Sequence, residues 1–96
     1  MAMHNPPHPG DTIKHDILPA LALTITDAAD ALELSRKTLS AICNGRQAIT
    51  PEVAVKLAAA FGGSAAVWLR QQSAYDLWQA EQTVDISHIP RFQVVA

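Results

Sequence analysis

The sequence predicts an all-α fold, in which five short helices form one domain and a short extended tail follows. Residues suited to cap a helix recur along the chain, and each begins a stretch in which apolar residues repeat every three or four positions. Glycine, proline or short polar links separate these stretches, and no convincing strand precedes Thr83. The chain has 96 residues, enough for one domain with a modest core.

The first helix follows a proline-rich start. Residues 1–9 hold three of the six prolines, so we expect a flexible N-terminal arm there. Asp11 or Thr12 is suited to cap the helix, and Pro19 is expected to end or bend it. Its predicted apolar face comprises Ile13, Ile17 and Leu18.

The second and third helices are separated by only about three residues. Thr26, followed by Asp27, is the expected cap of the second helix, which runs to about Leu32. Ser35 is the expected cap of the third helix, and Asn44-Gly45 is suited to end it. This spacing predicts a helix-turn-helix. The apolar positions of the two helices are Ile25, Ala28, Ala29 and Leu32, then Leu39, Ile42 and Cys43.

The last two helices have clear start signals. Thr50-Pro51-Glu52 combines a cap, a proline at the first helical position and an acid, and Gly62-Gly63 is suited to end that helix. Ser64 then begins a helix that reaches about Gln82. The predicted helix-turn-helix domain therefore covers residues 10–82. Apolar positions on the fourth helix are Val53, Ala54, Leu57, Ala58 and Phe61.

The tail, residues 83–96, changes character. Val84 and Ile86 alternate with polar residues, a pattern compatible with a strand. A terminal strand in a helical domain would pair with its copy in a dimer or with another protein. A coil is an equally good interpretation of the same residues.

One local surface is suited to nucleic acid. The net charge is −2, so affinity for a polyanion must come from a local face, and residues 34–51 contain no acid and three of the seven basic residues. Arg36 is the first candidate for reading a base, because arginine makes bidentate hydrogen bonds to guanine. Solvated charge with no partner is the competing interpretation. The candidate DNA-binding residues are Thr26, Ser35, Arg36, Lys37, Thr38, Ser40, Asn44, Gly45 and Arg46.

Acidic residues set a condition on this interpretation. The second predicted helix carries Asp27, Asp30 and Glu33, which would repel phosphates if they faced DNA. We therefore expect them to lie to the side of the DNA-binding face.

Other classes of protein lack support. Paired carboxylates, a Ser-His-Asp set and a glycine-rich phosphate loop are absent, so the sequence predicts no enzyme and no cofactor. His4 and His8 have no neighbouring cysteine or acid to complete a metal site, and Cys43 fits a buried core position. No apolar run approaches the roughly 20 residues that cross a bilayer, and no secretory signal is recognisable, so we expect a cytoplasmic protein without membrane contact.

Three aromatic residues of the fifth helix have two interpretations. Trp68, Tyr75 and Trp78 could pack onto the core or could mark a protein interface, where aromatic residues concentrate. The sequence favours neither.

Several motifs together resemble the HigA-type antitoxins, a branch of the Xre, or lambda-repressor-like, helix-turn-helix family. They are the HPG start, NGR-x-x-ITPE, W-L-x-x-Q and Y-D-L-W, within a resemblance that spans about residues 8–82. The resemblance implies an all-helical homodimer that binds the operator DNA of its own operon and neutralises a cognate toxin, a RelE-like mRNA-cutting protein.

Carried over residue by residue, the resemblance places the recognition helix on Ser35–Cys43. It places DNA-facing positions on Arg36, Lys37, Thr38 and Ser40, and a turn that contacts the DNA backbone on Asn44–Arg46. One departure concerns Glu33, where the family often has glycine. If that position needs a positive φ, the turn is either strained by about 1 kcal/mol or differently shaped.

Two alternatives to an antitoxin remain open. A free-standing Xre-type transcriptional regulator needs only the helix-turn-helix part of the resemblance. A protein-interaction module without DNA binding would fit the acidic net charge and the aromatic C-terminal half.

Overall fold

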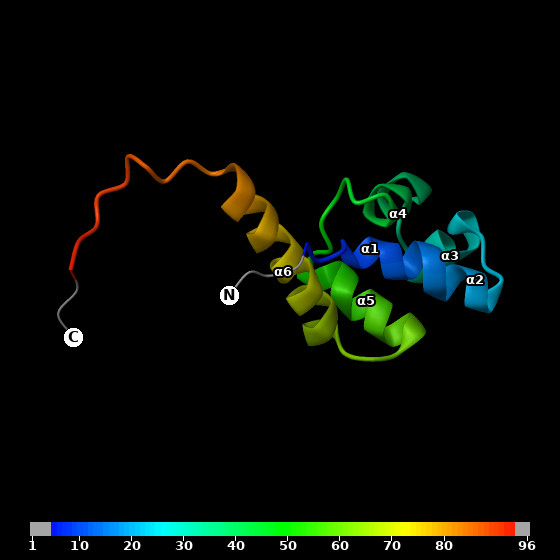
Figure 1. The fold of residues 1–96 in the computed structure, drawn as a ribbon. Helices are drawn as coiled ribbons and strands as arrows, with labels where there is room; N and C mark the ends of the chain where they lie inside the picture. Colours follow the sequence, from blue (N-terminus) through cyan, green and yellow to red (C-terminus); the bar gives the residue numbers. More distant parts are fainter. Residues whose placement is uncertain (1–4, 94–96) are drawn as a thin grey trace.

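Residues 5–93 are described by the computed structural model, and within that range the chain forms five helical segments and no strand (Figure 1). The predicted all-α fold is therefore confirmed. His4, Val94 and Val95 lie outside the described residues.

The first segment is one continuous helix in three parts: α1 (Pro9–Thr12), the π-helical η1 (Ile13–Ile17) and α2 (Leu18–Leu21). Neither Asp11 nor Thr12 caps it. The cap is His8, whose Nδ1 accepts a hydrogen bond from the Gly10 amide at 2.9 Å. His8 and Pro9 are buried and therefore pack with the domain, although both were expected in the flexible arm. Pro9 starts the helix because proline suits the first turn, where its missing N–H is not needed.

Pro19 does not end this helix. The π-helical turn lies immediately before it, and the Leu18 amide bonds to the Ile13 carbonyl. In a regular α-helix the proline ring would meet the carbonyl four residues earlier, and the wider π turn displaces that carbonyl. The helix ends at Leu21, after which Ala22 adopts a left-handed conformation with φ of 54°.

The predicted helix-turn-helix comprises α3 (Ile25–Leu32) and α4 (Arg36–Cys43). Thr24 caps α3 by accepting a hydrogen bond from the Asp27 amide at 3.0 Å, so the assignment of Thr26 as the cap was wrong. Ser35 caps α4 as predicted, accepting from the Thr38 amide at 3.0 Å.

The last two helices are α5 (Pro51–Phe61) and α6 (Ala65–Thr83). Thr50 and Ser64 cap them as predicted. Gly62 and Gly63 both have positive φ, which explains why glycines connect these helices.

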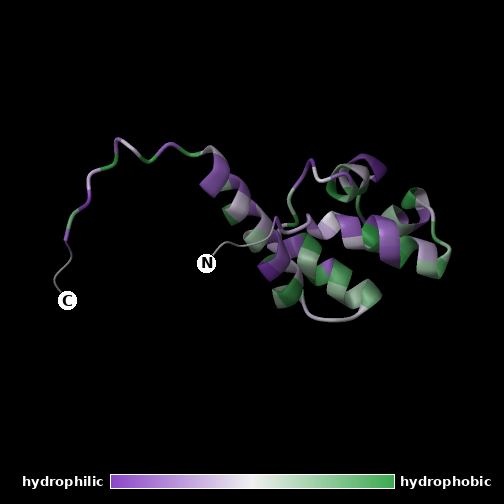
Figure 2. Ribbon diagram, in the orientation of Figure 1, coloured by the Kyte–Doolittle hydropathy of each residue, from purple (hydrophilic) through white to green (hydrophobic). Residues whose placement is uncertain are grey.

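The core lies between the first helical segment, α3, α4, α5 and the first half of α6. α5 packs against α6 and α3, while α1 contacts both α4 and α6. Figure 2 shows hydrophobic residues along much of α5. The buried apolar residues include every predicted inward position of the third helix; they are Ile13, Leu18, Ala28, Ala29, Leu32, Leu39, Ile42, Cys43, Ile49, Val53, Ala54, Leu57 and Trp68.

The second half of α6 extends beyond the other helices, and residues 84–93 continue from it as a coil with one turn (Figure 1). The buried residues of α6, Trp68 and Gln72, both lie in its first half. Residues 84–93 form no strand in the single chain, and a strand paired with a second chain stays a prediction. Among the described residues, no helix has the length and apolar character that crossing a membrane requires.

Candidate nucleic-acid interface

The two faces of α4 are separated as the sequence predicts. Leu39 and Ile42 are fully buried, whereas Arg36 and Lys37 are exposed. Thr38 and Ser40 are half-buried at the margin. The first turn of α4 therefore presents two positive charges, while the apolar face of the same helix packs against the core.

Ser35 and Thr38 are linked to each other. The Ser35 hydroxyl accepts from the Thr38 amide and donates to Thr38 Oγ1 at 2.8 Å. Both hydroxyls thus help to order the start of α4. Arg36 and Lys37 are left as the longer side chains available to contact a ligand there.

The turn after α4 is tightly hydrogen-bonded. Asn44 donates from Nδ2 to the Ser40 carbonyl at 2.9 Å, and the Arg46 amide bonds to the Ala41 carbonyl at 2.8 Å. Gly45 has φ of 72°, a conformation that favours glycine. The Arg46 side chain is exposed. The turn therefore offers one cation on an ordered backbone.

Lys14 is a residue that the sequence did not indicate for this surface. Its Nζ donates to Asn44 Oδ1 at 2.8 Å, which adds a positive charge beside the turn. The two residues are thirty positions apart in the chain, so no local pattern could have indicated the contact.

Thr26 is exposed in the first turn of α3 but does not cap that helix. Asp27, Asp30 and Glu33 are exposed as well. Their position relative to DNA remains a prediction.

The turn between α3 and α4 is left-handed at Glu33, with φ of 55° and ψ of 42°. Of the two alternatives for this position, the strained conformation is the one observed. Lys56 stabilises it from α5: its Nζ donates to the Glu33 carbonyl at 3.3 Å and lies 3.6 Å from Glu52 Oε2.

His8 and Cys43 have structural roles. Burial lowers the pKa of His8 despite the nearby carboxylates of Asp11 and Asp76, so the neutral ring, which caps α1, is favoured. Burial raises the pKa of Cys43, and the nearby Lys14 only partly opposes this, so the thiol stays protonated in the core. In residues 5–93 no group of three or more histidine, cysteine, aspartate or glutamate side chains is placed to hold a metal ion.

Trp68 and Tyr75 of α6 pack within the domain, and the interface interpretation of the α6 aromatic residues stays a prediction. Trp68 belongs to the core. Tyr75 is half-buried and meets the His8 ring edge-on, with ring centroids 4.9 Å apart. Trp78 is also half-buried.

Comparison with known proteins places this geometry in a family. Residues 18–68, which contain α3, α4 and α5, match the HTH_3 helix-turn-helix model. The chain is 41% identical over 91 residues to the HTH-type transcriptional regulator YddM of Escherichia coli, covering 95% of this chain and 96% of YddM. It is 39% identical over 69 residues to antitoxin HigA-1 of Vibrio cholerae, covering 72% of this chain and 65% of HigA-1.

A solved structure gives the same result for the fold. The Pseudomonas aeruginosa antitoxin HigA with higBA promoter is similar over 90% of this chain and 96% of that chain, with a TM-score of 0.79 and 28% identity. The chain belongs to the Xre-type helix-turn-helix family of DNA-binding regulators and antitoxins, in which its relatives include HigA antitoxins.

Proposed function

We propose that this protein is the antitoxin of a type II toxin–antitoxin pair, which represses its own operon and neutralises a RelE-like mRNA-cutting toxin. The observation that carries the DNA-binding part is the exposed Arg36 and Lys37 on a helix whose opposite face is buried. The similarity to an antitoxin HigA solved with its promoter supports the same role.

Base reading and backbone contact would come from different residues. Arg36 at the start of α4 can reach a guanine edge, with Lys37, Thr38 and Ser40 beside it. Asn44–Arg46 would contact the phosphate backbone, and Thr26 at the start of α3 could do so as well. Ser35 would act by ordering the start of α4 through its bonds to Thr38.

A dimer is part of the proposal, because even with Lys14 beside Arg36, Lys37 and Arg46 each copy offers only four basic side chains, a small electrostatic contact. Two recognition helices should lie about 34 Å apart, one turn of DNA. The surface for dimerisation would come from α6 and the tail, where large apolar side chains are more than half exposed: Leu77, Val84, Ile86, Ile89 and Phe92.

The toxin-binding part rests on the similarity to HigA-1 of Vibrio cholerae, which is described as an antitoxin. The partner would be the product of the neighbouring reading frame.

Two readouts in one strain test the proposal. The neighbouring reading frame is expressed with and without this protein, and a reporter is placed behind the promoter of the operon. We expect growth arrest without the protein, relief of arrest with it, and repression of the reporter. The double variant Arg36→Ala/Lys37→Ala should lose repression but should still relieve arrest, because the proposal assigns these two side chains to the DNA contact.

The outcomes separate the alternatives. Repression without relief would show a free-standing regulator, the alternative that needs only the helix-turn-helix part of the similarity. Relief without repression would show an interaction module. Absence of both effects would contradict the proposal.

A further inference from the structure

The turn that follows the recognition helix is held from the side by two buried polar residues, His8 and Gln72. We propose that His8 and Gln72 are positioning residues that fix the segment 44–49 on α6, so that its grip on the DNA backbone depends on α6. This inference rests on the proposed DNA binding. We call His8 and Gln72 the α6 brace, because they connect the segment to α6.

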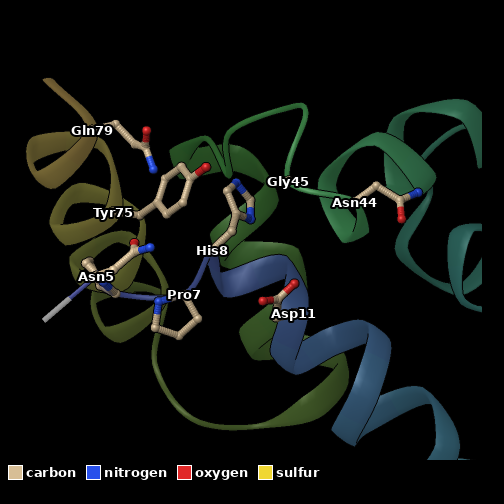
Figure 3. A pocket seen from close by; sticks show the side chains of 9 residues that line it. Asn5, Pro7, His8, Asp11, Asn44, Gly45, Tyr75 and Gln79 are labelled. Carbon is tan, nitrogen blue, oxygen red and sulfur yellow. The ribbon is translucent and has the colours of Figure 1, made fainter. Parts of the chain in front are cut away.

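His8 connects the beginning of the segment to α1 and α6. Its side chain is 5% exposed, and its Nδ1 accepts from the Gly10 amide. Because Nδ1 is an acceptor, the proton of the neutral ring is on Nε2, and the ring also forms a hydrogen bond with the backbone of Gln47. The ring meets Tyr75 of α6 at an interplanar angle of 77°. Figure 3 shows the His8 ring between Tyr75 and the turn at Gly45.

Gln72 connects the end of the segment to α6. Its Oε1 accepts from the Ile49 amide at 2.8 Å, and its Nε2 donates to Asp76 Oδ1 at 2.9 Å. Gln72 is 4% exposed and Ile49 is 3% exposed. A buried amide that loses its acceptor is costly, so this contact strongly fixes the backbone at Ile49.

The exposed part of the segment lies between these two contacts. Arg46, Gln47 and Ala48 are exposed, while Gly45 lies against His8: a Cβ placed on Gly45 would be 3.7 Å from His8 Cβ and Cγ. The proposed backbone-gripping residues are therefore held at one end by an imidazole ring and at the other by a side-chain amide.

Open space beside the turn would allow the turn to move if the brace were absent. A cavity of about 460 Å³ lies next to it, and its lining includes His8, Asn44, Gly45, Tyr75 and Gln79 (Figure 3). If the His8 ring is removed, the turn loses its contact with that ring and can shift toward the cavity. A phosphate contact depends on such placement, since hydrogen bonds weaken steeply away from their preferred geometry.

The test uses the full chain with two variants and two matched controls. His8→Asn keeps an acceptor for the Gly10 amide, since asparagine is a good N-cap, but it removes the ring contacts. Gln72→Met keeps the length of the side chain but removes the acceptor for Ile49. The controls are His15→Asn and Gln71→Met, because both residues are exposed. Amide exchange at residues 45–49 is measured by NMR, and affinity is measured for the operon promoter and for base-substituted copies.

We expect both brace variants to exchange faster at residues 45–49 than the parent, while the core amides of α5 keep their protection. Affinity should fall roughly 3- to 10-fold, the scale of one lost hydrogen bond, and equally for all promoter copies. The controls should match the parent.

Three results would overturn the brace. The first is unchanged exchange in both variants. The second is unchanged affinity for DNA despite faster exchange. The third is a loss that depends on the base substitutions, which would place the effect on base reading. If Gln72→Met does not fold, His8→Asn decides by the same criteria. If the parent itself binds no promoter DNA, the proposed function fails. The claim that the brace serves DNA binding then fails with it. Amide exchange still decides whether the brace holds the segment 44–49.

Discussion

At the scale of single residues, the least expected features are a histidine cap and a glutamate in a left-handed turn. His8 caps α1 although histidine is not among the preferred N-cap residues. Glu33 occupies a conformation that favours glycine. The resemblance to antitoxins gave the second feature as one of two alternatives, because glycine is frequent at that place in the family. The first could not be predicted, because the ring of His8 is fixed by Tyr75, which lies far along the chain.

The strain at Glu33 can be measured. Glu33→Gly should raise the free energy of unfolding, because it removes about 1 kcal/mol of backbone strain. The gain should remain below that value, since glycine also increases the conformational entropy of the unfolded chain. Urea denaturation measures the change.

Asp30→Gly is the matched control, since Asp30 is also exposed but lies within α3. That variant should lose up to roughly 1 kcal/mol, because glycine is unfavourable within a helix. Destabilisation of the Glu33→Gly variant to the same extent as the control would show that Glu33 is not strained.

At the scale of elements, the caps of the last three helices were predicted correctly, and those of the first two were not. Ser35, Thr50 and Ser64 each cap the expected helix. Thr24 caps α3 in place of the predicted Thr26, so that Ile25 enters the helix and packs against the core. Local sequence cannot choose between such neighbours, because tertiary packing decides which turn becomes helical.

The contact between α1 and α4 is also invisible to local patterns. Gly10 lies so close to the end of α4 that an added Cβ would overlap the Ile42 carbonyl oxygen. The recognition helix therefore rests directly on the backbone of α1, and this explains why a glycine occurs within the first helical turn.

Gly10→Ala tests that close approach. Alanine favours a helix over glycine, yet the overlap with the Ile42 backbone should cost roughly 1–3 kcal/mol in the free energy of unfolding. Chemical denaturation monitored by circular dichroism measures the loss.

Gly63→Ala is the comparison, because nothing lies within 4 Å of its added Cβ and only its φ of 77° opposes the change. It should lose about 1 kcal/mol. Equal or greater stability of the Gly10→Ala variant relative to the parent would contradict the packing of α1 on α4.

At the scale of the whole molecule, the helical order and the exposed basic face of α4 follow from the sequence, while the arrangement around the turn after α4 does not. Periodic apolar residues define which face of each helix is buried, and this places Arg36 and Lys37 on the outside of α4. The contacts of Lys14 with Asn44 and of Gln72 with Ile49 join distant parts of the chain. The net charge of −2 makes this local surface decisive, because the molecule as a whole does not attract DNA.

The central claim is that α4 reads bases while the following turn grips the backbone. The measurement is the affinity of the parent, Arg36→Ala and Arg46→Ala for the operon promoter and for a set of base-substituted copies at fixed salt. Arg36→Ala should lose roughly 1–3 kcal/mol on the native promoter and should discriminate less among the substituted copies. Arg46→Ala should bind every copy more weakly by the same factor. If Arg36→Ala binds and discriminates as the parent does, α4 is not the reading helix.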